Sequence, residues 1–130
     1  LLANDATQTP LYFSPRLPEL LGSSVADALT RPGHWFDEVH PDDRARVAAE
    51  SARCAAAGDA FRSEYRHRRA DGSWVWVRDE CVPERDAAGA VVAWHGVMVD
   101  ISDQHRLREA LVAARDAAEA AEQRTREVLA

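Results

Sequence analysis

Residues 61–102, FRSEYRHRRADGSWVWVRDECVPERDAAGAVVAWHGVMVDIS, decide the fold. Within them, Asp71-Gly72 predicts a β-hairpin, because the tight turn that it favours needs a positive φ, which glycine adopts at little cost. A second turn, at residues 86–89, separates the second apolar segment from a third. The stretch therefore predicts three antiparallel strands in a meander. After Asp100 the pattern changes to a long polar helix.

Length and charge limit the classes of protein to which the chain can belong. It has 130 residues and a formal net charge of −6, which is enough length for one hydrophobic core. The negative charge argues against nucleic acid as the main partner, since binding to phosphates needs a positive field. No window is long and apolar enough to span a bilayer, so we expect no membrane contact. The chain does not begin with Met, and we expect a piece of a longer cytoplasmic protein.

Upstream of the meander the pattern indicates a strand at residues 10–14 and then several short helices. The motif at residues 40–43, His-Pro-Asp-Asp, predicts the start of a longer helix, with proline in the first position and acidic residues in the first turn. This order predicts an α+β fold, an antiparallel sheet with short helices on one face. We divide the chain into a domain at residues 1–102, whose first strand is truncated, and a helix at residues 103–130.

The predicted sheet is apolar on both faces. In the last strand Val97 and Val99 lie on one face, and Trp94 and Met98 lie on the other. An antiparallel sheet with one face in water alternates apolar with polar residues instead. We therefore expect the helices to cover one face and a second copy of the chain to cover the other. Strand alternation alone leaves open which face is turned toward the helices.

A series of short motifs follows in order along the chain: Tyr12-Phe13-Ser14-Pro15, Glu19-Leu20-Leu21-Gly22, His40-Pro41-Asp42-Asp43-Arg44, Phe61, Glu64-Tyr65-Arg66, Asp71-Gly72, Trp76-Val77, Gly89, Gly96-Val97 and Val99-Asp100-Ile101-Ser102. The series resembles a PAS domain of the subgroup that ends in the PAC motif. Each motif alone is weak, but together they cover nearly all of residues 10–102. The resemblance implies a five-stranded antiparallel sheet that holds a small cavity against short helices. It also implies sensing or dimer-mediated relay within a larger signalling protein.

Many PAS domains bind a small molecule, and the resemblance implies a candidate pocket. Its lining would come from some of Trp35, Phe36, Phe61, Tyr65, His95 and Val97. A filled core without a ligand is the alternative.

No cofactor is evident, because neither Cys54 nor Cys81 lies in the Asn-Cys-Arg segment of a photoactive flavin domain. Haem needs a histidine that faces the cavity, and His34 beside Pro32-Gly33 is better explained as a loop residue. Both cysteines are expected to be reduced thiols.

The sequence gives no support for a metal site or for catalysis. His40 is explained by the start of a helix rather than as a ligand with Asp42 and Asp43, since Arg44 would repel a cation. No nucleophile elbow and no glycine-rich phosphate loop is present. His105 does not lie in the box that surrounds the phosphorylated histidine of a sensor kinase. We therefore expect a non-catalytic module.

The C-terminal part of the chain resembles a signalling linker. Asp100-Ile101-Ser102 is similar to the family's Asp-Ile-Thr terminus, where the aspartate commonly makes an ionic contact, and Arg66 and Arg78 are its candidate partners. The predicted seam of a parallel coiled coil follows alternating steps of four and three residues. It comprises Leu107, Leu111, Ala114, Ala118, Ala121, Thr125 and Val128. The alternative is a solvated helix in which alanine is merely common.

These observations predict a cytoplasmic PAS sensor and relay module of a bacterial two-component system. We expect a homodimer, formed through the outer sheet face and the C-terminal helix, that passes a signal through residues 100–102 toward a histidine kinase. Residues 125–130 depart from the family's usual next segment, so a diguanylate cyclase or a phosphatase is an alternative output. A ligand-free dimerisation module is the alternative class of function.

Overall fold

The structure is a computed structural model that describes the chain apart from residues 1, 8, 32 and 33 and the side chain of His34. The chain divides into two compact units, Leu1–Asp100 and Ile101–Ala130. In the described residues the first unit contains the strands and the short helices. The second is the long helix α5 (Ser102–Leu129).

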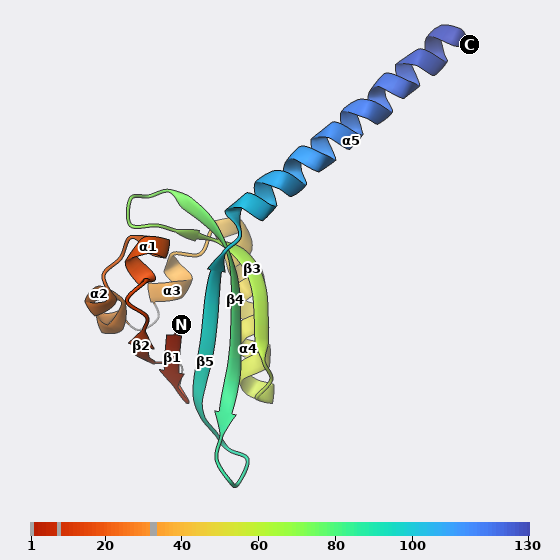
Figure 1. Ribbon diagram of the computed structural model, residues 1–130. Coiled ribbons are helices and arrows are strands. Elements are labelled where there is room, and N and C mark those ends of the chain that lie inside the picture. The colour runs from red at the N-terminus through yellow and green to blue at the C-terminus, as the bar shows by residue number, and fades with distance from the viewer. Residues whose placement is uncertain (1, 8, 32–33) are drawn as a thin grey trace. The chain divides into compact units, whose positions relative to one another are not determined.

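The first unit is built on one five-stranded antiparallel sheet (Figure 1). Its strands are β1 (Leu2–Asp5), β2 (Pro10–Phe13), β3 (Phe61–Arg68), β4 (Trp74–Arg85) and β5 (Val91–Asp100), in the order β2-β1-β5-β4-β3. The predicted meander is therefore β3-β4-β5, and Gly72 in its first turn has a φ of 86°. The predicted fold class is confirmed, and β1 is the strand that the sequence left doubtful.

In the described part of the chain, four helices precede the meander. They are α1 (Leu17–Leu21), α2 (Val25–Thr30), α3 (His34–Asp37) and α4 (Pro41–Ala57). The start of α4 matches the prediction, because Pro41 occupies its first turn and the His40 Nδ1 accepts the Asp42 N–H at 3.1 Å. The helix ends at Gly58, whose φ of 66° is the left-handed conformation common at such ends.

The core lies between one face of the sheet and these helices. Leu21 from α1 and Val47 from α4 pack with Tyr65, Val75 and Val77 from the sheet, and all five are buried. In β5, Trp94 is on this inner face and only 5% exposed. The neighbouring residues of the opposite face are exposed, among them Trp74, Val82, Val97 and Val99. The structure thus decides the question that strand alternation left open.

Helix α5 has no buried residue along its 28 residues. The first two members of the predicted seam, Leu107 and Leu111, are each 63% exposed. Ion pairs within the helix, such as Arg115 with Glu119 and Arg126 with Glu122, lie between charged residues one turn apart. The coiled coil stays a prediction. Within the described residues, no helix is long and apolar enough to cross a membrane.

Gly96 is the point at which β5 tolerates no side chain. A Cβ there would lie 2.6 Å from the Cys81 Sγ and 3.0 Å from the Glu80 carbonyl oxygen. We expect Gly96→Ala to lower the free energy of unfolding by about 1–3 kcal/mol, because overpacking forces neighbouring groups to shift. Urea denaturation measures this loss.

The Cys81→Ala background provides the control, because it removes the closest of the contacts that oppose a Cβ at position 96. Gly96→Ala should cost less in this background than in the native chain. An equal cost in both backgrounds would show that the sulfur is not the obstacle.

Candidate ligand cavity

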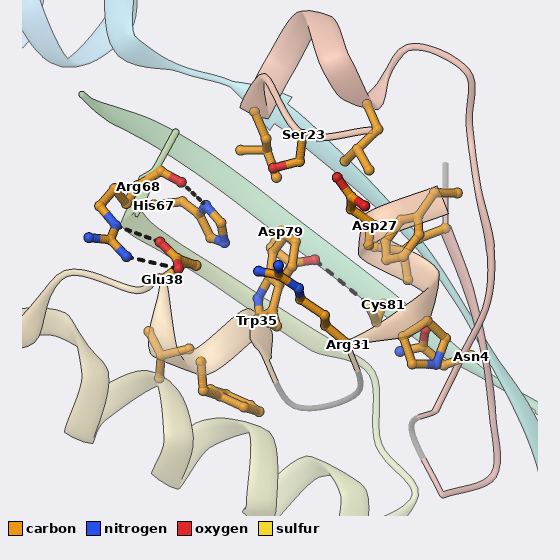
Figure 2. A pocket seen from close by; sticks show the side chains of 18 of the residues that line it. Asn4, Ser23, Asp27, Arg31, Trp35, Glu38, His67, Arg68, Asp79 and Cys81 are labelled. Atoms are coloured by element: carbon orange, nitrogen blue, oxygen red, sulfur yellow. Dashed lines mark hydrogen bonds and ion pairs between the residues drawn. The ribbon is translucent and has the colours of Figure 1, made fainter. Parts of the chain in front are cut away.

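A cavity of about 560 Å³ lies in the first unit, and side chains of β1–β5 and α1–α4 line it. Its aromatic lining residues are Phe13, Trp35, Phe36, Phe61 and Trp94. Polar side chains also reach it, among them Asn4, Asp27, Arg31, His67 and Asp79 (Figure 2). A site of this size, mostly apolar and with a few polar groups, is typical of small-molecule pockets.

Asp79 is the buried acid of this cavity, with only 6% of the residue exposed. Its Oδ2 accepts a hydrogen bond of 2.7 Å from the Tyr65 hydroxyl, which in turn accepts one of 2.9 Å from the Trp35 Nε1. The Asp79 Oδ1 has a weaker contact, 3.7 Å from the Cys81 Sγ (Figure 2). This hydrogen-bond chain joins α3, β3 and β4 beneath the cavity.

Burial governs the protonation of this group of residues. It raises the pKa of Asp79 to about 6, although hydrogen bonds from Tyr65 and Cys81 act in the opposite direction. Burial, together with the nearby Asp79 carboxylate, raises the pKa of Cys81 to about 12. The same two causes raise the pKa of Tyr65 well above its usual value. Near neutral pH, Cys81 and Tyr65 are therefore neutral hydrogen-bond donors, and Asp79 is largely a carboxylate.

The basic side chains that line the cavity differ in how they are held. Arg68 forms two hydrogen bonds to the Glu38 carboxylate, at 2.6 and 2.9 Å. Arg69 pairs with Asp100 at 3.2 Å. Arg31 is exposed. His67 is buried, with its ring 4.4 Å from that of Trp35 and its Nδ1 3.0 Å from the Arg68 carbonyl oxygen.

Three of the six predicted pocket residues, Trp35, Phe36 and Phe61, line the cavity. A fourth, Tyr65, is fully buried beside it and bonded to Trp35. The prediction for His95 and Val97 is wrong. Both lie on the outer face, where His95 has a side chain 52% exposed and pairs with Glu84 at 2.5 Å. The reason is strand alternation, which places their neighbour Trp94 inside instead.

Sequence reasoning missed Asp79, although the pattern contained a signal for it. Asp79 follows Val75 and Val77 at steps of two, so it belongs to the same face of β4 as those two buried valines. A charged residue in a row of buried positions is uncommon unless it has a partner or a function. Asn4 was also missed, because the strand that carries it was expected to be truncated.

At the end of β5 the structure corrects the predicted partner of Asp100. The ion pair runs to Arg69, in the turn between β3 and β4, and not to Arg66 or Arg78. Asp100 lies opposite Val77 in the sheet, close to the end of β4 that follows this turn. Ile101 is buried, and Ser102 is the first residue of α5.

Arg66 and Arg78, the two partners predicted for Asp100, form ion pairs with other acids. Arg66 donates two side-chain hydrogen bonds of 2.9 Å to Asp43, and its guanidinium lies 5.2 Å from the centre of the Trp76 ring. These hydrogen bonds hold the pKa of Asp43 below its usual value. Arg78 pairs with Glu80 at 3.4 Å.

Metal and haem binding were not expected from the sequence. Among the described residues, no group of three or more histidine, cysteine or acidic side chains is placed to hold a metal ion. His40 faces Asp42 through the hydrogen bond that begins α4. The prediction for His34 falls on a side chain outside the described part of the structure, so it stays a prediction.

The family of the chain follows from its sequence as well as from this architecture. A family model described as PAS fold matches residues 10–98. The chain therefore belongs to the PAS-fold family, as the motifs predicted.

Relatives of the chain include components of signalling proteins. It is 34% identical to an uncharacterised protein, y4lL, of Sinorhizobium fredii, in an alignment that covers 82% of the present chain. It is also 34% identical to the two-component sensor PprA of Pseudomonas aeruginosa, in an alignment that covers 74% of the present chain. These matches span only 13% and 10% of the two relatives. The chain thus corresponds to a small part of each.

Solved structures agree with this assignment. The N-terminal domain of a diguanylate cyclase with a PAS/PAC sensor from Marinobacter aquaeolei has a TM-score of 0.73 and 29% identity, covering 80% of this chain and 95% of that one. A sensory box histidine kinase/response regulator from Burkholderia thailandensis has a TM-score of 0.72 and 25% identity, covering 91% and 88%.

Protonation of Asp79 should stabilise the fold. Its pKa is about 6 in the folded chain against 3.8 for an ordinary aspartate, so the folded state binds more protons between these pH values. The resulting stabilisation is fully present below the lower pKa and is lost as the pH rises through the higher one. It corresponds to about 3 kcal/mol at most. Asp79→Asn lacks this contribution.

Urea denaturation at about pH 7 and about pH 4.5 measures the effect. The stability of the native chain relative to Asp79→Asn should rise toward the lower pH. Asp59→Asn, an exposed acid in the turn after α4, is the matched control and should show no such trend. A constant difference between the native chain and Asp79→Asn at both pH values would contradict the prediction.

Proposed function

We propose that the chain is the sensor and relay module of a larger signalling protein, and that occupancy of its cavity changes how two α5 helices pair. The observation that carries this proposal is the position of Asp79 on the strand that neighbours the end of β5. Asp79 lies opposite Met98, and Val77 lies opposite Asp100. The floor of the cavity and the last residue of β5 therefore share one hydrogen-bonded ladder.

This ladder offers a short mechanical route. A ligand that contacts Asp79 would shift β4, and the pairing of β4 with β5 would carry that shift to Asp100. The Arg69–Asp100 ion pair ties the end of β5 to the β3–β4 turn. Because α5 begins at Ser102, two residues later in the chain, movement at Asp100 acts on the start of the helix.

The outer face of the sheet supports assembly into a homodimer. Trp74, Val82, Val97 and Val99 are large apolar side chains exposed on this face of β4 and β5, and Trp74 is 45% exposed. Large apolar side chains exposed on one face of a sheet favour an interaction site there. A second copy of the chain would cover it and would bring two α5 helices together along the predicted seam.

The relatives support a signalling output without choosing one. The chain resembles part of a two-component sensor and of a sensory box histidine kinase, and it also resembles the PAS/PAC sensor of a diguanylate cyclase. We propose a histidine kinase output, with a cyclase as the alternative. In either case the first unit would act as a cytoplasmic, non-catalytic input to the domain that follows α5.

The junction is tested with the chain fused through α5 to a reporter histidine kinase. Asp79→Asn removes the cavity charge and serves as a surrogate input. We expect it to change kinase output at least about threefold when Asp100 is present, and to have little effect in the Asp100→Ala background. Two coupled residues give such non-additive effects. Autophosphorylation with labelled ATP is the measurement.

Asp59→Ala, an exposed acid remote from the junction in sequence, is the control background, and there Asp79→Asn should keep its full effect. Loss of the exposed Arg69–Asp100 pair should cost only about 1 kcal/mol of folding stability or less, so the variant should remain folded. The same response to Asp79→Asn with and without Asp100 would rule out this route.

The coiled coil is tested by strengthening its seam. Replacing Ala114 and Ala121 with leucine should tighten the dimer by at least about tenfold, because each leucine adds apolar area to the seam. Leucines at Ala113 and Ala120, one position off the seam, are the matched control and should have a smaller effect. Sedimentation equilibrium gives the dissociation constants, and equal constants for both variants would contradict the seam.

A further inference from the structure

The chemistry of the cavity lining narrows the kind of molecule that it can hold. The Asp79 carboxylate is a buried polar group of the lining whose hydrogen-bonding capacity is still partly open. Tyr65 occupies its Oδ2 at 2.7 Å, whereas its Oδ1 has only the thiol of Cys81, a weak donor, at 3.7 Å. A buried carboxylate is stabilised by a positive partner or by strong hydrogen-bond donors. A ligand could supply either.

The walls around this carboxylate are aromatic. Trp35 is two hydrogen bonds away from Asp79, and Phe61 lies opposite Cys81 in the sheet. Phe36 and Trp94 complete this part of the lining. Aromatic faces attract organic cations through the ring quadrupole, most strongly where water is excluded. A carboxylate together with aromatic walls is an arrangement that favours a cation over an anion.

Among the described residues, the arginine side chains that line the cavity form no ion pair with Asp79. Arg68 is paired with Glu38, and Arg69 is paired with Asp100. Arg31 is exposed, and within the described residues it has no ion pair. His67 lies in the floor, with its Nδ1 against the Arg68 carbonyl oxygen. The buried Asp79 carboxylate is therefore a negative charge in the lining that none of these arginines neutralises.

A second acceptor lies elsewhere in the lining, on β1. The Asn4 Oδ1 is buried and has no hydrogen-bond partner among the described residues. Asn4 is opposite Trp94, whereas Asp79 is opposite Met98, so the two acceptors lie at different points along β5. A ligand with a donor at each end of an apolar ring would serve both acceptors. The Arg69 Nε in the same lining is also buried without a hydrogen-bond partner among the described residues, so a ligand that matches all three groups carries donors for Asp79 and Asn4 and an acceptor for Arg69.

We propose that the cavity binds an organic cation with a ring-sized apolar body, with the Asp79 carboxylate as the anchor of its charged group. The inference rests on the proposed sensor function, since it names the ligand class of the same cavity. The volume of about 560 Å³ accommodates a body of this size. The aromatic side chains hold the ring, and Asn4 accepts a hydrogen bond from a donor on it.

Three probes that share one body and differ in charge test the assignment. Tryptamine carries an ammonium group, 3-ethylindole is neutral and indole-3-propionate carries a carboxylate. Isothermal titration calorimetry with the native chain should find tryptamine binding at least about tenfold more tightly than 3-ethylindole, with indole-3-propionate weakest, because only the cation pairs with the buried carboxylate. This series needs no variant, so it is decisive whether or not a substitution disturbs folding.

Variants then locate the charge that is recognised. Asp79→Asn, checked for folding by circular dichroism, should weaken tryptamine by at least about tenfold and leave 3-ethylindole nearly unchanged. Asp59→Asn, at an exposed acid outside the lining, is the matched control and should leave tryptamine within about twofold. A preference for indole-3-propionate that Arg31→Gln abolishes would identify an anion site instead and overturn the proposal.

Two further outcomes also overturn it. Equal affinities for tryptamine and 3-ethylindole would show that the cavity selects apolar shape alone, and no heat from any probe at millimolar concentration would exclude this ligand class. These failures are distinct from a failure of the relay, which is measured by kinase output in the fusion. If tryptamine binds selectively but Asp79→Asn does not change kinase activity in the fusion, the proposed ligand class is supported and the proposed relay is contradicted.

Discussion

The hydrogen-bond chain from Trp35 through Tyr65 to Asp79 is the interaction on which the cavity depends. It joins a short helix to two strands of the sheet, with contacts of 2.9 and 2.7 Å. Helix α3 has only four residues and little stability of its own. The bond from Trp35 to a fully buried tyrosine helps to hold this helix against the sheet. One buried acid therefore organises the floor of the cavity and part of its wall.

The same acid makes the site responsive. Burial raises the pKa of Asp79 to about 6, so its carboxyl gains or loses a proton near that pH. A well-satisfied apolar core would be more stable but would offer nothing for a ligand to recognise. Keeping a carboxylate beside an open volume costs folding free energy, and functional sites commonly carry such costs. Asp79 lies on β4, which pairs with β5, the strand that leads into α5. The residue that carries this cost is therefore next to that strand.

The candidate site was only partly predictable. Trp35, Phe36 and Phe61, which the family resemblance placed in a candidate pocket, lie in the lining of the cavity. His95 and Val97 were wrongly assigned, since the sheet is apolar on both faces and alternation gives two equivalent choices. The Arg69 partner of Asp100 was missed because it depends on how separate strands and turns come together. Asp79 was missed although it continues the row of Val75 and Val77 on one face of β4.

The sequence by itself determined the meander, the helix that starts at Pro41 and the long polar α5, because these follow from local turn chemistry, capping and the spacing of apolar residues. It also determined membership of the PAS-fold family, through motifs that resemble that family in order along the chain. Only the tertiary structure decided which face of the sheet is covered, that Asp79 lies beneath a cavity, and that Asp100 pairs with Arg69. Those outcomes depend on the register between strands and on how helices pack against one face. Residues distant in the chain set both, and no local pattern encodes them.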